Sequence, residues 1–185
     1  MDPLRLRLDR NKAALLVVDI QDRLCAAMDP KALDRLIRRT RALIEGARAL
    51  ELPILVTEQY PKGLGNTLGP IRAALGDEQK VVEKVEFSCA IPEVVKGLTG
   101  RPQVLIAGME THVCVYQTAR DLSERKFVPF LCADAVLSRN EEDRAIGLER
   151  CREAGAVVTT VEGALFDLLG RAGTPEFKRV SAAVK

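Results

Sequence analysis

The feature that most constrains the fold is a repeated alternation between short apolar runs and longer stretches with helical periodicity. The first run, AALLVV at residues 13–18, is apolar at every position, which is typical of a strand buried on both faces. Similar runs predict five more strands, at residues 53–57, 79–82, 103–107, 128–132 and 157–160. Strands that alternate with helices form parallel pairs, so the pattern predicts a parallel sheet.

The segments between these runs have apolar residues at helical spacing. They predict helices at residues 30–51, 71–75, 91–98, 113–126, 141–154 and 164–169. We expect a loop at residues 60–70 because Pro and Gly are dense there, while residues 171–185 follow neither pattern. The sequence therefore predicts a three-layer α/β/α fold with an open, mainly parallel six-stranded sheet of the Rossmann-like kind.

The length and composition favour one globular domain over residues 1–185. The 28 basic and 26 acidic residues give a net charge of +2, which offers no electrostatic reason to expect a nucleic acid partner. No apolar stretch approaches the roughly 20 residues that span a bilayer, and the N-terminus is charged, so we expect a cytoplasmic protein without membrane contact. The five cysteines include no CxxC motif, which argues against disulfides and thiolate zinc sites and favours buried apolar roles.

Several polar residues follow the predicted strands directly. Asp19 follows the first strand, residues 58–60 the second, Lys84 the third, residues 108–114 the fourth and Asp134 the fifth. Open α/β sheets bind ligands beyond the carboxyl ends of their strands. We therefore expect an acid, an amine and a thiol to meet at this edge.

Cys114 lies near the start of the helix predicted after the fourth strand. Free backbone N–H groups there favour a thiolate, and a nearby Lys84 ammonium would lower the pKa of Cys114 further. Asp19 could accept the thiol proton and return it to a leaving amine. The N–H groups of residues 110–114 could stabilise an oxyanion.

Each of these residues also has a purely structural explanation. Taken alone, Cys114 is better read as a packed helix residue, Asp19 as a strand-end cap and Lys84 as a surface charge. Their convergence at one edge favours the catalytic reading. The only histidine, His112, is two positions from Cys114, so the two side chains diverge and a structural hydrogen bond is the expected role of the imidazole.

Three segments, VVDIQD, VEKVEFS and GMETHVCV, occur in the order and positions typical of the isochorismatase-like cysteine hydrolases. The chain resembles this family from about Asn11 to about Leu169. The stretch TEQYPKGLGNT resembles a branch described as isochorismatase-domain hydrolases of unassigned substrate.

The resemblance implies a triad of Asp19 as general base, Lys84 as the stabilising cation and Cys114 as nucleophile. It further implies a cis peptide between Met109 and Glu110, with the backbone N–H groups of Glu110 and Cys114 forming the oxyanion hole.

One position departs from the pattern. Nicotinamidases of this superfamily have an Asp-x-His metal site after the second strand, where this chain has Glu58-Gln59-Tyr60, so we expect no metal and no cofactor. Gln59 is a candidate substrate donor, and Tyr60 and Phe87 are candidate pocket walls. Local loop packing explains these three equally well.

Three hypotheses follow. The first is a metal-independent hydrolase that cleaves a C–N bond of a small amide-like compound through a thioester. The second is an isochorismate-type vinyl-ether hydrolase, for which Asp19 would suffice and the thiol would be dispensable. The third is a non-catalytic binding or scaffold protein, against which the intact triad argues. The resemblance also implies a homo-oligomer.

Overall fold

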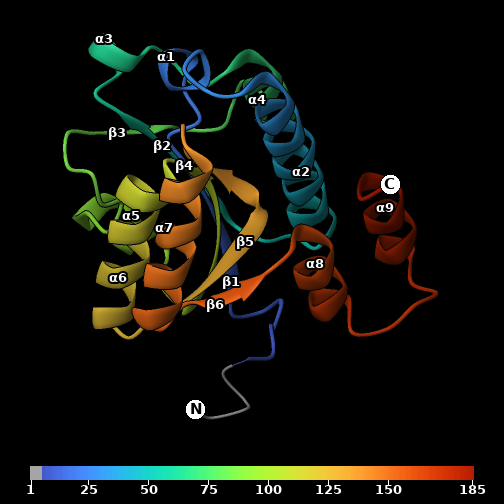
Figure 1. Cartoon of the computed structure of the whole chain (residues 1–185). Helices are drawn as coiled ribbons and strands as arrows, with labels where there is room; N and C mark the ends of the chain where they lie inside the picture. Colours follow the sequence, from blue (N-terminus) through green and yellow to red (C-terminus); the bar gives the residue numbers. More distant parts are fainter. Residues whose placement is uncertain (1–5) are drawn as a thin grey trace.

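The computed structural model describes residues 6–185, which fold around a parallel sheet (Figure 1). The strands are β1 Ala13–Val18, β2 Ile54–Gln59, β3 Val82–Lys84, β4 Gln103–Met109, β5 Val128–Leu137 and β6 Val157–Thr159. Their spatial order is β3-β2-β1-β4-β5-β6, and every neighbouring pair is parallel. The predicted six-stranded α/β architecture is confirmed.

The helices cover both faces of the sheet. They are α1 Asp22–Cys25, α2 Pro30–Ala49, α3 Pro61–Leu64, α4 Gly69–Leu75, α5 Pro92–Gly97, the π-helical turn η2 Thr111–Val115, α6 Tyr116–Glu124, α7 Glu141–Glu153, α8 Val161–Leu169 and α9 Pro175–Ala183. In Figure 1, α5, α6 and α7 lie on one side of the sheet, and α2 and α8 on the other, with α9 packed against α2.

Strand β1 shows why the sheet needs both layers. Alternate side chains of a strand point to opposite faces. Leu15 and Val17 join the core under α2 and α8, whereas Leu16 and Val18 join the core under α5 and α6. Every residue of β1 is buried, as the unbroken apolar run predicts.

The strand order reverses direction beside β1. From β1 the chain moves outward through β2 to β3, then returns to the other side of β1 for β4, β5 and β6. The crevice between β1 and β4 is therefore the switch point at which open α/β sheets place their ligands. No helix within residues 6–185 combines the length and the apolar character needed to cross a membrane.

Four expectations on element bounds were wrong or incomplete. Strand β3 lies later than predicted, so Lys84 ends the strand instead of following it. The Pro- and Gly-rich residues 60–70 contain α3 and the start of α4, because Pro61 and Pro70 occupy first-turn positions where no backbone N–H is needed. The tail forms α9, whose first turn is capped by the Thr174 hydroxyl.

Strand β5 is also longer than the predicted run, which moves Asp134 away from the expected edge. Asp134 lies inside β5, accepts a hydrogen bond from the Val161 N–H at 2.8 Å and lies 3.4 Å from Arg39. It therefore ties α8 and α2 to the sheet and is not part of the site.

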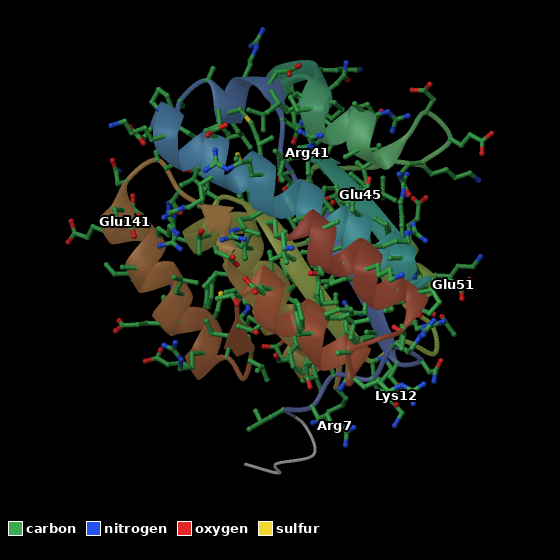
Figure 2. All side chains as sticks on the ribbon, turned by 90° about the vertical axis from the view of Figure 1, so that its right-hand side faces the viewer. Arg7, Lys12, Arg41, Glu45, Glu51 and Glu141 are labelled. Atoms are coloured by element: carbon green, nitrogen blue, oxygen red, sulfur yellow. The ribbon has the colours of Figure 1, made fainter. Side chains whose placement is uncertain are left out.

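The surface carries charges of both signs. Figure 2 shows side chains of both kinds spread over one side of the molecule: Arg7, Lys12, Arg41, Glu45, Glu51 and Glu141. All five cysteines are buried and free, as expected from their number and spacing.

Candidate active site

The carboxyl ends of four neighbouring strands bring Asp19, Lys84 and Cys114 together. The strand register pairs Val18 of β1 with Thr57 of β2 and with Gly108 of β4. Asp19 follows Val18 directly, with a positive φ of 47°. Lys84 pairs with Gln59 at the end of β3, and Cys114 lies in η2 after β4. The topology thus brings Asp19 next to Lys84, which lies 65 positions further along the chain.

Asp19 and Lys84 form a buried ion pair. Lys84 Nζ lies 2.7 Å from Asp19 Oδ2, and neither side chain is exposed to solvent. The ammonium has further acceptors in Gln59 Oε1 at 3.0 Å and in the carbonyls of Glu86 and Phe87 at 3.0 and 3.1 Å. Burial acts to lower the pKa of Lys84, but the neighbouring Cys89 and Asp19 outweigh it and raise the pKa. Lys84 is therefore a fixed cation at neutral pH.

Burial opposes the thiolate that the helix start and Lys84 were expected to favour at Cys114. The residue is only 6% exposed, and its Sγ lies 3.8 Å from Gln59 Oε1. Burial and the negative charge of Asp19 raise the pKa of Cys114, while the Lys84 ammonium lowers it by less. The helix start and the lysine do not overcome desolvation. The Asp19 carboxylate lies close enough to act on this pKa, so a carboxylate neighbours the thiol.

Gln59 is held by a network of amides. Its side-chain nitrogen donates to the Val85 carbonyl at 2.8 Å, so its oxygen is directed toward Lys84 and Cys114. The buried Gln21 clamps the Gln59 backbone, accepting from its N–H at 2.7 Å and donating to its carbonyl at 3.0 Å. The Gln59 atom that faces Lys84 and Cys114 is therefore the side-chain oxygen, which is an acceptor. The role of Gln59 as a substrate donor remains a prediction.

The turn before Cys114 has the implied geometry. The peptide between Met109 and Glu110 is cis. The Glu110 side chain points away from the thiol, since its Oε1 accepts from the Arg139 N–H and the Arg139 Nε, each at 3.1 Å. The Glu110 carbonyl accepts from the amides of Val113 and Val115.

His112 has the structural role expected of it. Its Nδ1 lies 3.0 Å from Ser138 Oγ, at the end of a different strand from Cys114. This contact joins η2 to the residue after β5.

The position where related enzymes have a metal ligand is occupied by Glu58. Its Oε1 accepts from both the N–H and the hydroxyl of Thr67, at 2.5 and 2.6 Å. Within residues 6–185, no three His, Cys, Asp or Glu side chains are grouped as metal ligands. Glu58 instead anchors the loop that carries Tyr60.

On the Lys84 side of the site is a hollow of about 410 Å³ lined by Tyr60, Lys84, Val85 and Glu86, among others. Tyr60 is 55% exposed and Phe87 is 53% exposed, so both stand at the surface. Tyr60 lines the hollow, whereas Phe87 is not one of its lining residues and contributes its carbonyl to Lys84. Their role as walls of a substrate pocket remains a prediction.

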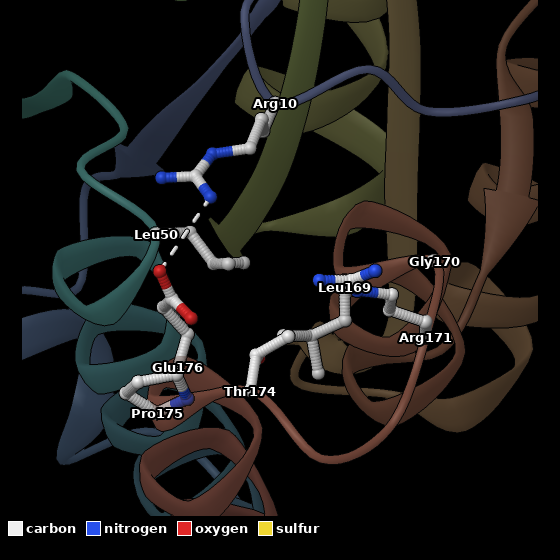
Figure 3. Close-up of a pocket in the computed structure, with 8 residues that line it drawn as sticks. All are labelled: Arg10, Leu50, Leu169, Gly170, Arg171, Thr174, Pro175 and Glu176. Atoms are coloured by element: carbon white, nitrogen blue, oxygen red, sulfur yellow. Dashed lines mark ion pairs between the residues drawn. The ribbon is translucent and has the colours of Figure 1, made fainter.

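A larger hollow, of about 540 Å³, lies at the opposite edge of the sheet (Figure 3). It is lined by Arg10, Leu50, Arg171 and Glu176, among others, and Arg10 points across it to Glu176. It lies at the amino ends of the strands, where this class of sheet does not place its reactive groups.

Two residues near Asp19 were not identified from the sequence. Thr57 donates its hydroxyl hydrogen bond to Asp19 Oδ1 at 2.8 Å, and its Oγ1 lies 3.3 Å from the Cys89 sulfur. The only available signal for Thr57 was a hydroxyl in an otherwise apolar strand. Cys89 offered none, because its proximity arises from the loop between β3 and α5.

The fold and the site define an α/β protein with a buried acid, amine and thiol at the switch point of a parallel sheet. The isochorismatase domain family matches residues 13–163 of the chain. The secreted isochorismatase effector Isc1 of Phytophthora sojae is 38% identical over 185 residues, covering 97% of this chain and 87% of that protein. The chain therefore belongs to the isochorismatase-like hydrolase family.

Solved structures agree with this assignment. A structure described as the MAR1 ribonuclease of Caenorhabditis elegans has a TM-score of 0.91 and 36% identity, covering 96% of this chain and 92% of that one. YcaC of Pseudomonas aeruginosa, described with hexane-2,5-diol and covalent acrylamide, has a TM-score of 0.84 and 25% identity, covering 96% and 91%. YcaC of Escherichia coli, described as an octameric hydrolase of unknown specificity, has a TM-score of 0.82 and 27% identity, covering 97% and 87%.

Proposed function

We propose that the protein is a metal-independent cysteine hydrolase that cleaves the C–N bond of a small amide-like compound. The observation that carries this proposal is the fully buried Asp19–Lys84 pair beside the Cys114 thiol. A buried ion pair contributes little net stability, so its presence in a crevice favours a catalytic role. The covalent acrylamide in the YcaC structure supports a reactive centre in this fold.

In the proposed first half-reaction, Asp19 removes the proton from Cys114 as the sulfur attacks the amide carbonyl. The N–H groups of Glu110 and Cys114 stabilise the oxyanion. The C–N bond then breaks, and Asp19 returns the proton to the departing amine, leaving a thioester on Cys114.

The second half-reaction repeats the proton transfers with water. Asp19 takes a proton from water, the oxygen attacks the thioester, and the proton returns to the sulfur as the carboxylic acid leaves. Lys84 keeps its charge throughout and holds the Asp19 carboxylate. Tyr60 lines the hollow of about 410 Å³, while the Gln59 oxygen and the Phe87 carbonyl contact Lys84. These three residues would contact the substrate, a small molecule.

The proposal is tested first by alkylation. Iodoacetamide followed by peptide mapping should label Cys114, which is 6% exposed and lies beside the proposed base, whereas Cys25 is 3% exposed and Cys89, Cys132 and Cys151 have no exposed surface. Asp19→Asn should slow Cys114 labelling about 100-fold at pH 7, because the base is lost. Lys84→Ala should slow it as well, and equal labelling in that variant would contradict the proposed activation.

Arg10→Met is the matched control, since it removes an ion pair at the far edge of the sheet and should leave the labelling rate unchanged.

Turnover distinguishes the remaining functions. In a screen of small amides, activity should survive EDTA and disappear in Cys114→Ser. Retained activity of Cys114→Ser on an isochorismate-type vinyl ether would favour the acid chemistry of Asp19 alone, which the protonated thiol also allows. Cleavage of RNA that does not need Cys114 would assign the activity after which the Caenorhabditis elegans relative is named. No Cys114-dependent turnover at all would favour a binding role.

We further propose a cytoplasmic homo-oligomer, with support from the octameric YcaC relative. Light scattering of the purified protein tests the oligomer, and a monomer would refute it. Fractionation of the source cells tests the compartment, and recovery outside the cells, as the name of the Phytophthora sojae relative describes for that protein, would refute it.

A further inference from the structure

Both oxygens of the Asp19 carboxylate accept hydrogen bonds, but the sequence predicted a partner, Lys84, for only one of them. Lys84 Nζ contacts Oδ2 at 2.7 Å, while Thr57 Oγ1 donates to Oδ1 at 2.8 Å. We propose that Thr57 is a positioning residue that fixes and stabilises the Asp19 carboxylate, and that the Cys89 thiol supports it by donating to the Thr57 hydroxyl. This inference rests on the proposed function, because it assigns roles around the proposed base.

The direction of the hydrogen bonds follows from counting protons. A threonine hydroxyl has one proton and can accept two hydrogen bonds. A carboxylate is a much stronger acceptor than a thiol sulfur, so the Thr57 proton lies on the Asp19 side. The 3.3 Å contact between Thr57 Oγ1 and Cys89 Sγ is then a donation from the Cys89 S–H. Such chains of hydrogen bonds strengthen one another in a low-dielectric interior.

Cys89 is suited to donate because it stays protonated and fixed. It is fully buried, and burial, followed by the Asp19 charge, raises its pKa to about 12. Its backbone N–H donates to the hydroxyl of Thr118 at 2.8 Å, which attaches Cys89 to α6, the helix that follows Cys114. The two ends of the chain Cys89–Thr57–Asp19 are therefore both anchored to elements that carry the site.

The backbone also couples Thr57 to Asp19. The Asp19 N–H donates to the Thr57 carbonyl at 3.2 Å, next to the Val18–Thr57 strand pair. The hydroxyl and the carbonyl of Thr57 thus hold both the side chain and the main chain of Asp19. A threonine that only satisfied its own hydroxyl in the core would not need the carboxylate as partner.

The chemical consequence concerns the pH dependence of the site. The titratable groups around Asp19 in the described residues are Lys84 from β3, Cys114 from η2 and Cys89 from the segment before α5. A hydrogen bond donated to a carboxylate favours its charged form. Without the Thr57 hydroxyl, the apparent pKa of the proton shared by Asp19 and Cys114 should therefore rise.

The test is the pH profile of Cys114 alkylation by iodoacetamide, measured by peptide mapping over the range in which each variant gives a native near-ultraviolet circular dichroism spectrum. Thr57→Val, which removes only the hydroxyl, should move the acid limb about one pH unit higher, the size expected for a hydrogen bond to a charged group. Thr57→Ser should restore the wild-type profile.

Thr40→Val is the matched control, because Thr40 is a buried threonine on α2 whose hydroxyl has no partner in the described part of the chain. Its profile should equal that of the wild type. Cys89→Ala should move the limb in the same direction as Thr57→Val by a smaller amount, and Cys89→Ser should not move it.

The outcomes separate the two proposals. If the wild type shows no Cys114-selective labelling, both the proposed function and this inference are overturned. If the wild type labels at Cys114 but Thr57→Val keeps its profile, only the role of Thr57 is overturned. Should Thr57→Val not fold, Cys89→Ala decides, because an unmoved limb in that variant overturns the hydrogen-bond chain.

Discussion

The two edges of the sheet both contain ion pairs, but they are built differently. At the carboxyl edge, Asp19 and Lys84 are 2.7 Å apart with neither side chain exposed. At the amino edge, Arg10 lies 3.8 Å from both Glu51 and Glu176, and these side chains are between 33% and 86% exposed. Only the first pair lacks the water that would otherwise solvate its charges.

The comparison also separates size from chemistry. The hollow at the amino edge is the larger, about 540 Å³ against about 410 Å³, yet its charged groups are accessible to solvent (Figure 3). A site that must hold a base, a cation and a nucleophile in fixed protonation states needs desolvation and complete hydrogen bonding more than volume. The buried edge has both.

The largest expected effect comes from breaking one ion pair at each edge. Lys84→Met leaves the Asp19 charge buried without its partner and should lower the free energy of unfolding by about 3–5 kcal/mol. Arg10→Met removes an exposed cation and should cost less than about 1 kcal/mol. Urea denaturation of the two variants and the wild type measures both values.

High salt sharpens this result. At 1 M salt the Debye length is about 3 Å, so the small cost of Arg10→Met should vanish, while the cost of Lys84→Met should persist. Equal costs for the two variants would show that burial does not distinguish the two edges.

A pair of glycines gives the next effect. Gly108, at the carboxyl end of β4, has a φ of 137°, and a Cβ there would collide with the Val18 carbonyl of the adjacent strand. Gly170, after α8, has a φ of 66° and open space around it. Gly108→Ala should cost more than about 3 kcal/mol, through strain and collision together. Gly170→Ala should cost about 1 kcal/mol, from the left-handed backbone alone.

Thermal unfolding monitored by circular dichroism measures the difference. If Gly108→Ala and Gly170→Ala lowered the unfolding temperature by similar amounts, β1 and β4 would have to move apart at the site with little cost in stability.

The smallest effect is the pH dependence of the amino edge. Hydrogen bonding to its own backbone amide and then to Thr174 lowers the pKa of Glu176 from its ordinary 4.5, with Arg10 adding to this. Because the folded pKa is the lower one, the stabilisation is present above about pH 4.5 and is lost as the pH falls through the folded value. Glu176→Gln should therefore be slightly less stable than the wild type at pH 7 and indistinguishable from it at pH 3, measured by urea unfolding at both values.

The sequence allowed much of the fold and the main residues of the site to be predicted. Apolar strands such as residues 13–18 are buried on both sides, so their composition alone reports their environment. Asp19 was found because it directly follows such a strand, and Cys114 because it lies near the start of the helix after another. The tail helix α9 and the short helix α3 were missed, since their formation depends on the Thr174 cap and on Pro61 at a first turn more than on apolar periodicity.

The protonation states and hydrogen bonds of the site could not be predicted in the same way. Cys114 was expected to be activated by its helix and by Lys84, but burial dominates and raises its pKa. Thr57 and Cys89 had no visible connection to Asp19 until the loop after β3 placed Cys89 beneath β2. Desolvation and contact depend on which atoms surround a group from every direction.

The sequence by itself determined the layered parallel sheet and the identity of the acid, amine and thiol that follow its strands. Periodicity and strand-end position are local properties of a chain, and they are preserved when it folds. The tertiary structure alone decided the order of the strands, that Asp19 is held from both sides, and that burial raises the pKa of Cys114. Those outcomes are set by distances and by the exclusion of water, which arise only when remote segments pack together.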